Sequence, residues 1–259
     1  MGKMSRWFLM AGMAGVLAMG GSADAAMENG QLQASTLNGT VEWLKAGSSG
    51  WKAVQLNQKF SAGDKIRTDQ SGSTVLALWD GNTIQLYSGS EFSIGTLRRD
   101  VKARQVEYVF GIHKGKLTAT IPAVSPKSKI QFETPLTTID VPPSEMDPTL
   151  TIAINPDGTA TITVDDGTVH TLSASDPQWT SSLDGGDQVQ AEFNSADGSV
   201  TVINLGGSFQ VVGPNGNPVT LNAGDTIVLR ASGAATFIPA GPGVDGPVAD
   251  TLGEPASGG

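Results

Sequence analysis

The chain has 259 residues, with 33 glycines, 14 prolines, no cysteine and a formal net charge of −9. This length suits one large domain or two smaller ones, and the glycine and proline content favours short strands joined by turns. The missing cysteines exclude a disulfide framework, thiol catalysis and thiolate metal sites.

The first 25 residues have the layout of a secretory signal peptide. Lys3 and Arg6 form a positive n-region, residues 7–19 form an apolar h-region, and Ala23-Asp24-Ala25 fits a small-x-small cleavage site. The apolar run is shorter than the roughly 20 residues that span a bilayer. We therefore expect cleavage after Ala25 and a mature protein that is periplasmic or secreted, with no integral membrane segment.

From about residue 40 onward, the chain alternates apolar and polar residues as half-buried strands do. Ile84 and Leu86 share one face of residues 83–87, and Phe92 and Ile94 repeat the pattern. The five apolar residues 75–79 (VLALW) predict a central strand buried on both faces, with Trp79 in the core, and hence at least two layers.

No long apolar stripe at helical spacing follows the signal peptide. The predicted fold class is therefore all-β. We expect a multi-stranded two-layer sandwich or a β-solenoid-like domain, followed by a second, smaller β region.

Four Asp-Gly pairs stand between strand-like segments and predict hairpins or tight corners. Type I′ turns, in which both central residues have positive φ, are the expected geometry. The pairs are Asp80-Gly81, Asp157-Gly158, Asp166-Gly167 and Asp197-Gly198.

One eleven-residue segment recurs far along the chain. AGDKIRTDQSG at 62–72 aligns without gaps on AGDTIVLRASG at 223–233. The separation exceeds the roughly 20–50 residues of a solenoid repeat. The match indicates either a second module built like the first or the shared requirements of a Gly-Asp turn that enters a strand.

Several separated motifs between residues 39 and about 172 occur in a characteristic order. They are GDKIRT at 63–68, LWDGNTI at 78–84, GKL at 115–117, ETP at 133–135, DGT at 157–159 and DGTV at 166–169. In this order the motifs resemble the FecR-type domain. The resemblance implies an exported β domain that senses or regulates by binding another protein.

Membrane-bound members of that family pass the state of an outer-membrane receptor to a cytoplasmic sigma factor. The motif region of this chain shows neither their transmembrane helix nor their cytoplasmic region. The resemblance therefore does not imply signalling to a sigma factor. The chain also departs from the family pattern at residues 140–148, where three prolines predict a loop.

These observations divide the chain into four parts. We expect a signal peptide at 1–25, a FecR-like β domain at 26–174, an additional β region at 175–240 that is a candidate partial repeat, and a disordered tail at 241–259. The Ser-, Asp- and Gly-rich residues 173–186 are a candidate linker.

Charge is distributed unevenly along the mature chain. Residues 26–129 have a net charge of +5 and residues 130–259 have a net charge of −15. Opposite charge on the two halves makes self-association a hypothesis, within one molecule or head-to-tail between molecules. The basic residues form either a solvated edge that discourages aggregation or a docking face for an anionic partner. The candidate face comprises Arg98, Arg99, Lys102, Arg104, Lys114 and Lys116.

Nothing in the sequence signals a reaction or a cofactor. His113 and His170 are the only histidines, and no G-x-S-x-G motif accompanies them. The Asp-Gly pairs lack the ligand spacing of a calcium loop, so we expect no metal site. The export signal and the acidic net charge disfavour nucleic acid as a partner.

The favoured function is an exported, non-catalytic β domain that binds a protein or another envelope component. The alternative is a protein that binds carbohydrate or an anionic surface polymer through its basic residues. A hydrolase with an unfamiliar site is the third hypothesis.

Overall fold

The computed structural model describes residues 27–122, 125–143, 147–173, 179–194, 196–197, 199–213, 216–230 and 234–240. The predicted signal peptide and the predicted tail lie outside these ranges. Within them all regular structure is β-strand, which confirms the all-β class. In the same ranges the chain has no helix long and apolar enough to cross a membrane.

The strands form two sheets that share one long strand. Sheet A contains, in spatial order, β4 (Lys52–Ala53), β3 (Val41–Leu44), β6 (Lys65–Thr68), β9 (Glu91–Asp100), β10 (Gln105–Thr120), β11 (Lys129–Glu133), β12 (Thr137–Val141), β15 (Thr168–Ser173), β16 (Thr180–Asp184), β19 (Ser208–Val212) and β20 (Pro218–Asn222). β1 (Glu28–Asn29) pairs with the end of β9.

Sheet B contains β5 (Lys59–Phe60), β2 (Leu32–Asn38), β7 (Ser73–Leu78), β8 (Thr83–Leu86), the second half of β10, β13 (Thr149–Ile154), β14 (Ala160–Asp166), β17 (Gln188–Asn194), β18 (Ser199–Gly206), β21 (Thr226–Leu229) and β22 (Ala235–Ile238). All pairs are antiparallel except β10 with β11.

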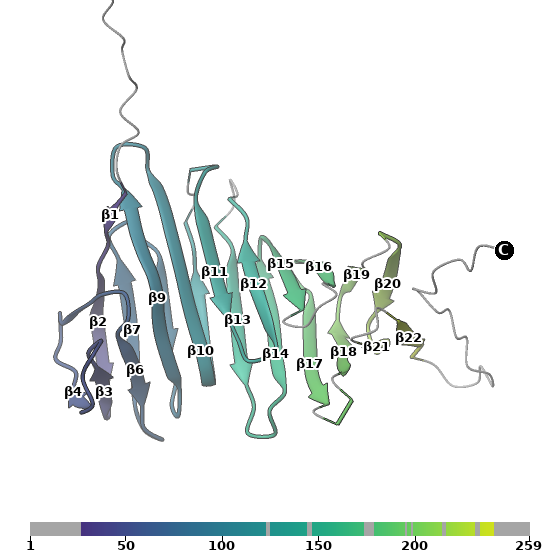
Figure 1. Ribbon diagram of the computed structural model, residues 1–259, viewed down its shortest axis with the longest axis horizontal. Helices are drawn as coiled ribbons and strands as arrows, with labels where there is room; N and C mark the ends of the chain where they lie inside the picture. The colour runs from purple at the N-terminus through teal and green to yellow at the C-terminus, as the bar shows by residue number, and fades with distance from the viewer. Residues whose placement is uncertain are drawn as a thin grey trace, which may run out of the picture.

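Successive hairpins lie alternately in sheet A and in sheet B, and their stacking gives the molecule its elongated form (Figure 1). The β7–β8 hairpin lies in sheet B, β9–β10 begins in sheet A, and β11–β12, β13–β14, β15–β16, β17–β18, β19–β20 and β21–β22 continue the alternation. The structure therefore combines both predicted forms, because two packed layers grow along one axis as a solenoid does.

β10 changes sheets at Gly115. Its first half pairs with β9 in sheet A, and its second half pairs with β8 and β13 in sheet B. Gly115 has φ of +80°, and an added Cβ would lie 2.6 Å from the Cα of Ser90. The Ser90 hydroxyl donates to the carbonyl of Lys116 (2.9 Å) and accepts from its N–H (3.0 Å), which satisfies the backbone at the switch.

The core lies between the sheets and differs along its length. In the first half Phe92, Phe110 and Phe132 pack in series, with successive ring centroids 5.5 and 5.7 Å apart. In the second half the buried residues are mainly aliphatic, and Trp179 and Phe209 are the aromatic side chains buried there among the described residues.

The prediction that residues 75–79 are buried on both faces is wrong. Leu76 and Leu78 point into the core, whereas Val75 and Ala77 are half-buried on the outer face of sheet B, because no further layer of the described chain covers that face. β7 is nevertheless central, with β2 and β8 on either side. Trp79 lies beyond the end of the strand, is 38% exposed, and is not a core residue.

The Asp-Gly pairs form tight turns of a different type from the one predicted. Gly81, Gly158 and Gly167 have positive φ, but the aspartates before them do not. In two loops the glycine N–H bonds the carbonyl three residues back, so the loop is a type I turn followed by a left-handed glycine. The carboxylates of Asp80 and Asp157 accept the backbone N–H two residues onward.

Asp166-Gly167 joins sheet B to sheet A instead of closing a hairpin. Asp197-Gly198 lies between the paired strands β17 and β18, although Gly198 is outside the described residues.

The two copies of the recurring segment share one turn, and a third copy occurs between them. In each copy a buried aspartate follows a glycine with φ of +89° to +98°, and a strand begins at the next residue. The aspartates are Asp64, Asp187 and Asp225. The last two are 38 positions apart in the numbering, which is within solenoid range.

The predicted linker at 173–186 is wrong in part. Residues 180–184 form β16, which pairs with β15 and β19, while 174–178 lie outside the described residues. The loop predicted at residues 140–148 is confirmed at 142–143 and 147–148, whereas Asp140 and Val141 belong to β12 and residues 144–146 lie outside the described residues.

Candidate functional site

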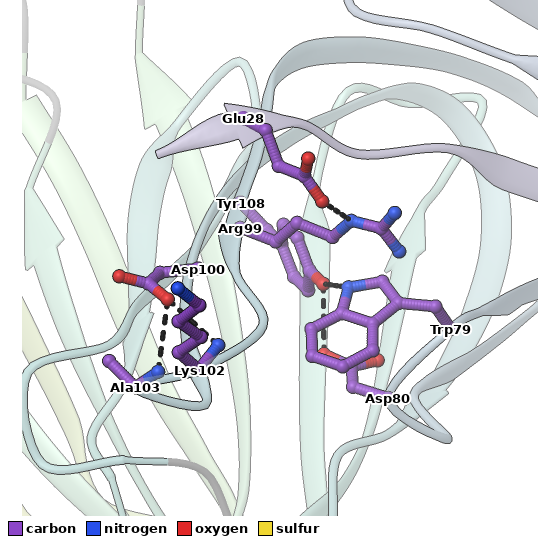
Figure 2. Close-up of polar contacts among 8 residues, drawn as sticks. All are labelled: Glu28, Trp79, Asp80, Arg99, Asp100, Lys102, Ala103 and Tyr108. Carbon is purple, nitrogen blue, oxygen red and sulfur yellow. Dashed lines mark hydrogen bonds and ion pairs between the residues drawn. The ribbon is translucent and has the colours of Figure 1, made fainter. Parts of the chain in front are cut away.

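The clearest cluster of exposed functional groups lies where the β7–β8 and β9–β10 hairpins turn. We name it the tip and define it as Trp79, Arg99, Val101, Lys102 and Arg104. Figure 2 shows Trp79, Arg99 and Lys102 with the polar residues that hold them. Trp79 and Val101 are 38% and 51% exposed, and they are two of the five large apolar side chains that are exposed in the described part of the chain.

Trp79 is fixed by a hydrogen-bond chain that starts in the core. Its Nε1–H donates to the hydroxyl of Tyr108 (3.0 Å), and that hydroxyl donates to Oδ2 of Asp80 (2.8 Å). Burial, together with the adjacent Asp80 carboxylate, raises the pKa of Tyr108 well above its usual value of 10.0. The phenol therefore stays protonated as the donor to Asp80, and the indole keeps one orientation.

Arg99 covers Trp79 and is itself held from the side. Its guanidinium carbon lies 5.1 Å from the indole centroid, and its Nε donates to Oε1 of Glu28 at 3.0 Å. β1 places Glu28 directly opposite Arg99. Arg99 is thus pre-oriented over an aromatic ring, an arrangement worth roughly 0.5–1 kcal/mol at an exposed site.

The β9–β10 turn presents the remaining cations. Asp100 is 7% exposed, and its Oδ1 accepts the backbone N–H groups of Lys102 and Ala103, both at 2.9 Å. Arg104 closes the turn with φ of +53°. Lys102 and Arg104 are exposed, and within the described part of the chain neither side chain forms an ion pair.

The structure divides the predicted anionic-partner face into two groups. Arg98, Arg99, Lys102 and Arg104 lie together at the tip end of the β9–β10 hairpin, and Arg98 pairs with Glu107 at 3.3 Å. Lys114 and Lys116 lie about ten residues along β10, which at about 3.3 Å a residue places them about 30 Å away. The Lys116 ammonium sits 4.9 Å from the ring centroid of Tyr87.

The two histidines are not brought together. His113 lies on β10 and His170 on β15, with β11 and β12 between them. Both are exposed.

Sequence reasoning missed a contact between His113 and Ser93. Nε2 of His113 lies 2.9 Å from the Ser93 hydroxyl, on the outer face of sheet A. The pair forms because Gly111 lies beneath it, where a Cβ would come within 2.4 Å of that hydroxyl. Among the described residues no carboxylate bonds this imidazole, so the pair lacks the orienting third member of a catalytic triad.

No group of three or more histidine or acidic side chains that could hold a metal ion occurs in the described ranges.

The sequence did not reveal that the five residues of the tip lie together. Its signal was the large aromatic residue immediately before an Asp-Gly turn, which was assigned to the core instead.

Comparison with known proteins assigns the chain to no family. No protein-family model matches the chain, and no curated protein matches it. Two crystal structures, at 1.65 and 2.50 Å resolution, of "a putative anti-sigma factor" from Parabacteroides distasonis ATCC 8503 are similar at 13% identity, with TM-scores of 0.40 and 0.39. Each match covers 62% of this chain and 60% of the other chain, and at these scores the likeness carries no argument about function.

Proposed function

We propose that this chain is an exported, non-catalytic binding protein of the cell envelope that recruits a protein partner through the tip. The observation that carries the proposal is the solvent-exposed Trp79, locked by Tyr108 and covered by Arg99. The FecR-like order of sequence motifs supports a sensing or regulatory role for the complex.

The tip has the composition of a protein-binding hot spot. Tryptophan and arginine are enriched among residues that dominate binding energy, and such residues are surrounded by a polar rim. Here Val101 is the second exposed apolar side chain of the tip, and Lys102 and Arg104 are its exposed cations. Because Trp79 and Arg99 are already held in place, a partner that binds them loses little further side-chain entropy.

The test is capture of envelope proteins by the purified mature protein and by matched variants. We expect one dominant partner, with its recovery reduced about tenfold or more by Trp79→Ala, a loss of at least about 1.4 kcal/mol. Leu205→Ala is the control, since Leu205 is 44% exposed but lies on β18, far along the molecule. Equal recovery by Trp79→Ala and wild type would contradict the proposal.

A second candidate, binding of an anionic surface polymer, rests on a different observation. Lys102 and Arg104 are exposed without a carboxylate partner in the described chain, and the neighbouring loop adds Lys127, whose carbonyl accepts from Gln105. This candidate predicts retention on an immobilised anionic polysaccharide that falls steeply with salt. Retention unchanged by replacing Lys102 and Arg104 with alanine would remove it.

A further inference from the structure

The outer face of sheet B has an uncharged row of side chains that crosses five adjacent strands. One register row crosses β8, β10, β13, β14 and β17, and every side chain in it is a half-buried threonine or glutamine. We name this set the polar row. It consists of Gln85, Thr118, Thr151, Thr163 and Gln188.

A second, shorter row lies beside the first. Thr83, Thr120 and Thr149 are register partners across β8, β10 and β13. Charged residues of these strands on this side of the sheet lie outside the two rows, at Lys116 on β10, at the end of β14 and at Glu192 on β17. A typical protein surface mixes charged residues throughout, so an uncharged area of this extent is uncommon.

The outer face of sheet A has the ordinary mixture. Glu107, Lys129 and Glu133 lie on the strands next to the sheet switch, and Asp140 and His170 face each other across β12 and β15. The two faces are built from the same alternating hairpins, so the difference is not a property of the fold.

The hydroxyls of the polar face are linked across strands. The Thr118 and Thr151 oxygens are 2.9 Å apart, the Tyr87 and Thr118 oxygens are 3.3 Å apart, and Thr149 donates to Thr120 at 3.4 Å. A hydroxyl offers one donor and two acceptor positions, so each linked hydroxyl retains capacity for an outside partner. The bonds between the hydroxyls orient them and so set the directions in which each one can still donate or accept.

From this face we infer a binding surface for an uncharged polysaccharide. A charged ligand would lose hydration without meeting an opposite charge, and an apolar ligand would leave the hydroxyls without partners. A sugar hydroxyl both donates and accepts, as the threonine hydroxyls do. Across five strands spaced about 4.8 Å apart the polar row extends about 19 Å, so one polymer chain contacts several strands at once.

The inference does not rest on the tip, and its test separates the two. The probes are dextran and hydroxyethylcellulose, dissolved in native gels, with retardation of the mature protein giving the dissociation constant. We expect retardation that is insensitive to salt, weakened about tenfold by Thr151→Lys, and unchanged by Lys102→Ala at the tip.

Two further variants keep the test informative. Ser182→Lys places the same charge at an exposed position on the outer face of sheet A and is expected to bind as wild type does. Combined Thr151→Val and Thr163→Val removes two hydroxyls without adding charge, retains strand propensity, and is expected to weaken binding severalfold.

Four results would overturn the inference. They are an absence of retardation by both neutral polymers, equal retardation of wild type and Thr151→Lys, retardation by anionic polymer alone, and a wild-type dimer that Thr151→Lys converts to a monomer. The last result would assign the face to a second copy of the chain.

Discussion

At the residue scale, three buried aspartates hold the turns at which the chain passes between sheets. The carboxylate of Asp64 accepts the N–H of Ser61 within its own turn and the N–H of Ala46 from another segment. Asp225 repeats this with Asn222 and Ala240. Asp187 does so with Asp184 and Ser208. One carboxylate thus closes a turn and fastens a neighbouring loop to it.

Removing such a carboxylate leaves two backbone donors without a partner. We expect Asp64→Ala to lower the free energy of unfolding by about 3–6 kcal/mol, since hydrogen bonds to a charged group contribute about 1.5–3 kcal/mol each. Urea unfolding measures the change. Asp165→Ala, at an exposed position, is the control and should change stability by less than about 0.5 kcal/mol. Similar effects of the two substitutions would show that the turn carboxylates contribute little.

Tyr108 gives the molecule a defined response to alkali. Its pKa is raised in the folded state, so above pH 10 the unfolded chain releases a proton that the folded chain keeps. Stability from this group is therefore complete below pH 10 and declines as pH rises above it. We expect Tyr108→Phe to be less stable at pH 7, because Trp79 and Asp80 lose a partner, but to lose less stability between pH 10 and 11 than wild type. An equal alkaline loss in both proteins would contradict this assignment.

At the element scale, the strands were predictable where the outer face is polar. β8 and β9 follow from plain alternation, and their buried residues, Ile84, Leu86, Phe92 and Ile94, are the predicted ones. β7 misled because its outer face bears Val75 and Ala77, small apolar residues that a sheet surface tolerates. Alternation alone cannot show whether another layer covers an apolar face.

The features that depend on contacts distant in sequence could not be predicted in the same way. The switch of β10 between sheets depends on Ser90, and the tip depends on Tyr108 lying behind Trp79. The repeated turn was detected in two copies because eleven residues match. Its copy at Asp187 keeps only the Gly-Asp pair, so the solenoid spacing became visible in the structure alone.

The β10 switch provides a test at this scale. Gly115→Ala would bring a Cβ into the backbone of Ser90 and require a residue with a side chain at φ of +80°. Gly47→Ala shares the second problem at φ of +75° but has open space around it, so it controls for the first. We expect Gly47→Ala to cost about 1 kcal/mol and Gly115→Ala clearly more, measured by urea unfolding. Equal costs would mean that the close approach at Gly115 is unimportant.

At the scale of the whole molecule, both sheets run continuously from the first hairpins to the last (Figure 1). β12 pairs with β15, and β16 pairs with β19, so strand pairing continues past residue 174, the expected end of the FecR-like domain. The basic first half and the acidic second half follow each other along this body. The two halves therefore do not dock against each other within one molecule. The self-association hypothesis now concerns head-to-tail contacts between molecules.

Continuous pairing predicts a gradient of stability along the body. β10 is the longest strand and has neighbours in both sheets, whereas β22 is paired with β21 alone among the described strands. We expect hydrogen-exchange protection to be highest in β10 and to fall gradually toward β22. A uniform plateau that drops sharply near residue 174 would instead indicate two independent modules.

We propose that this β scaffold acts by presenting the tip to a partner protein. Photo-crosslinking in living cells tests it most directly, with a benzophenone amino acid placed at Val101 in the tip or at Leu205 on β18. We expect one discrete protein adduct from position 101, abolished by Trp79→Ala, and none from position 205. Adducts of equal yield from both positions, or an adduct from position 101 that persists in Trp79→Ala, would contradict it.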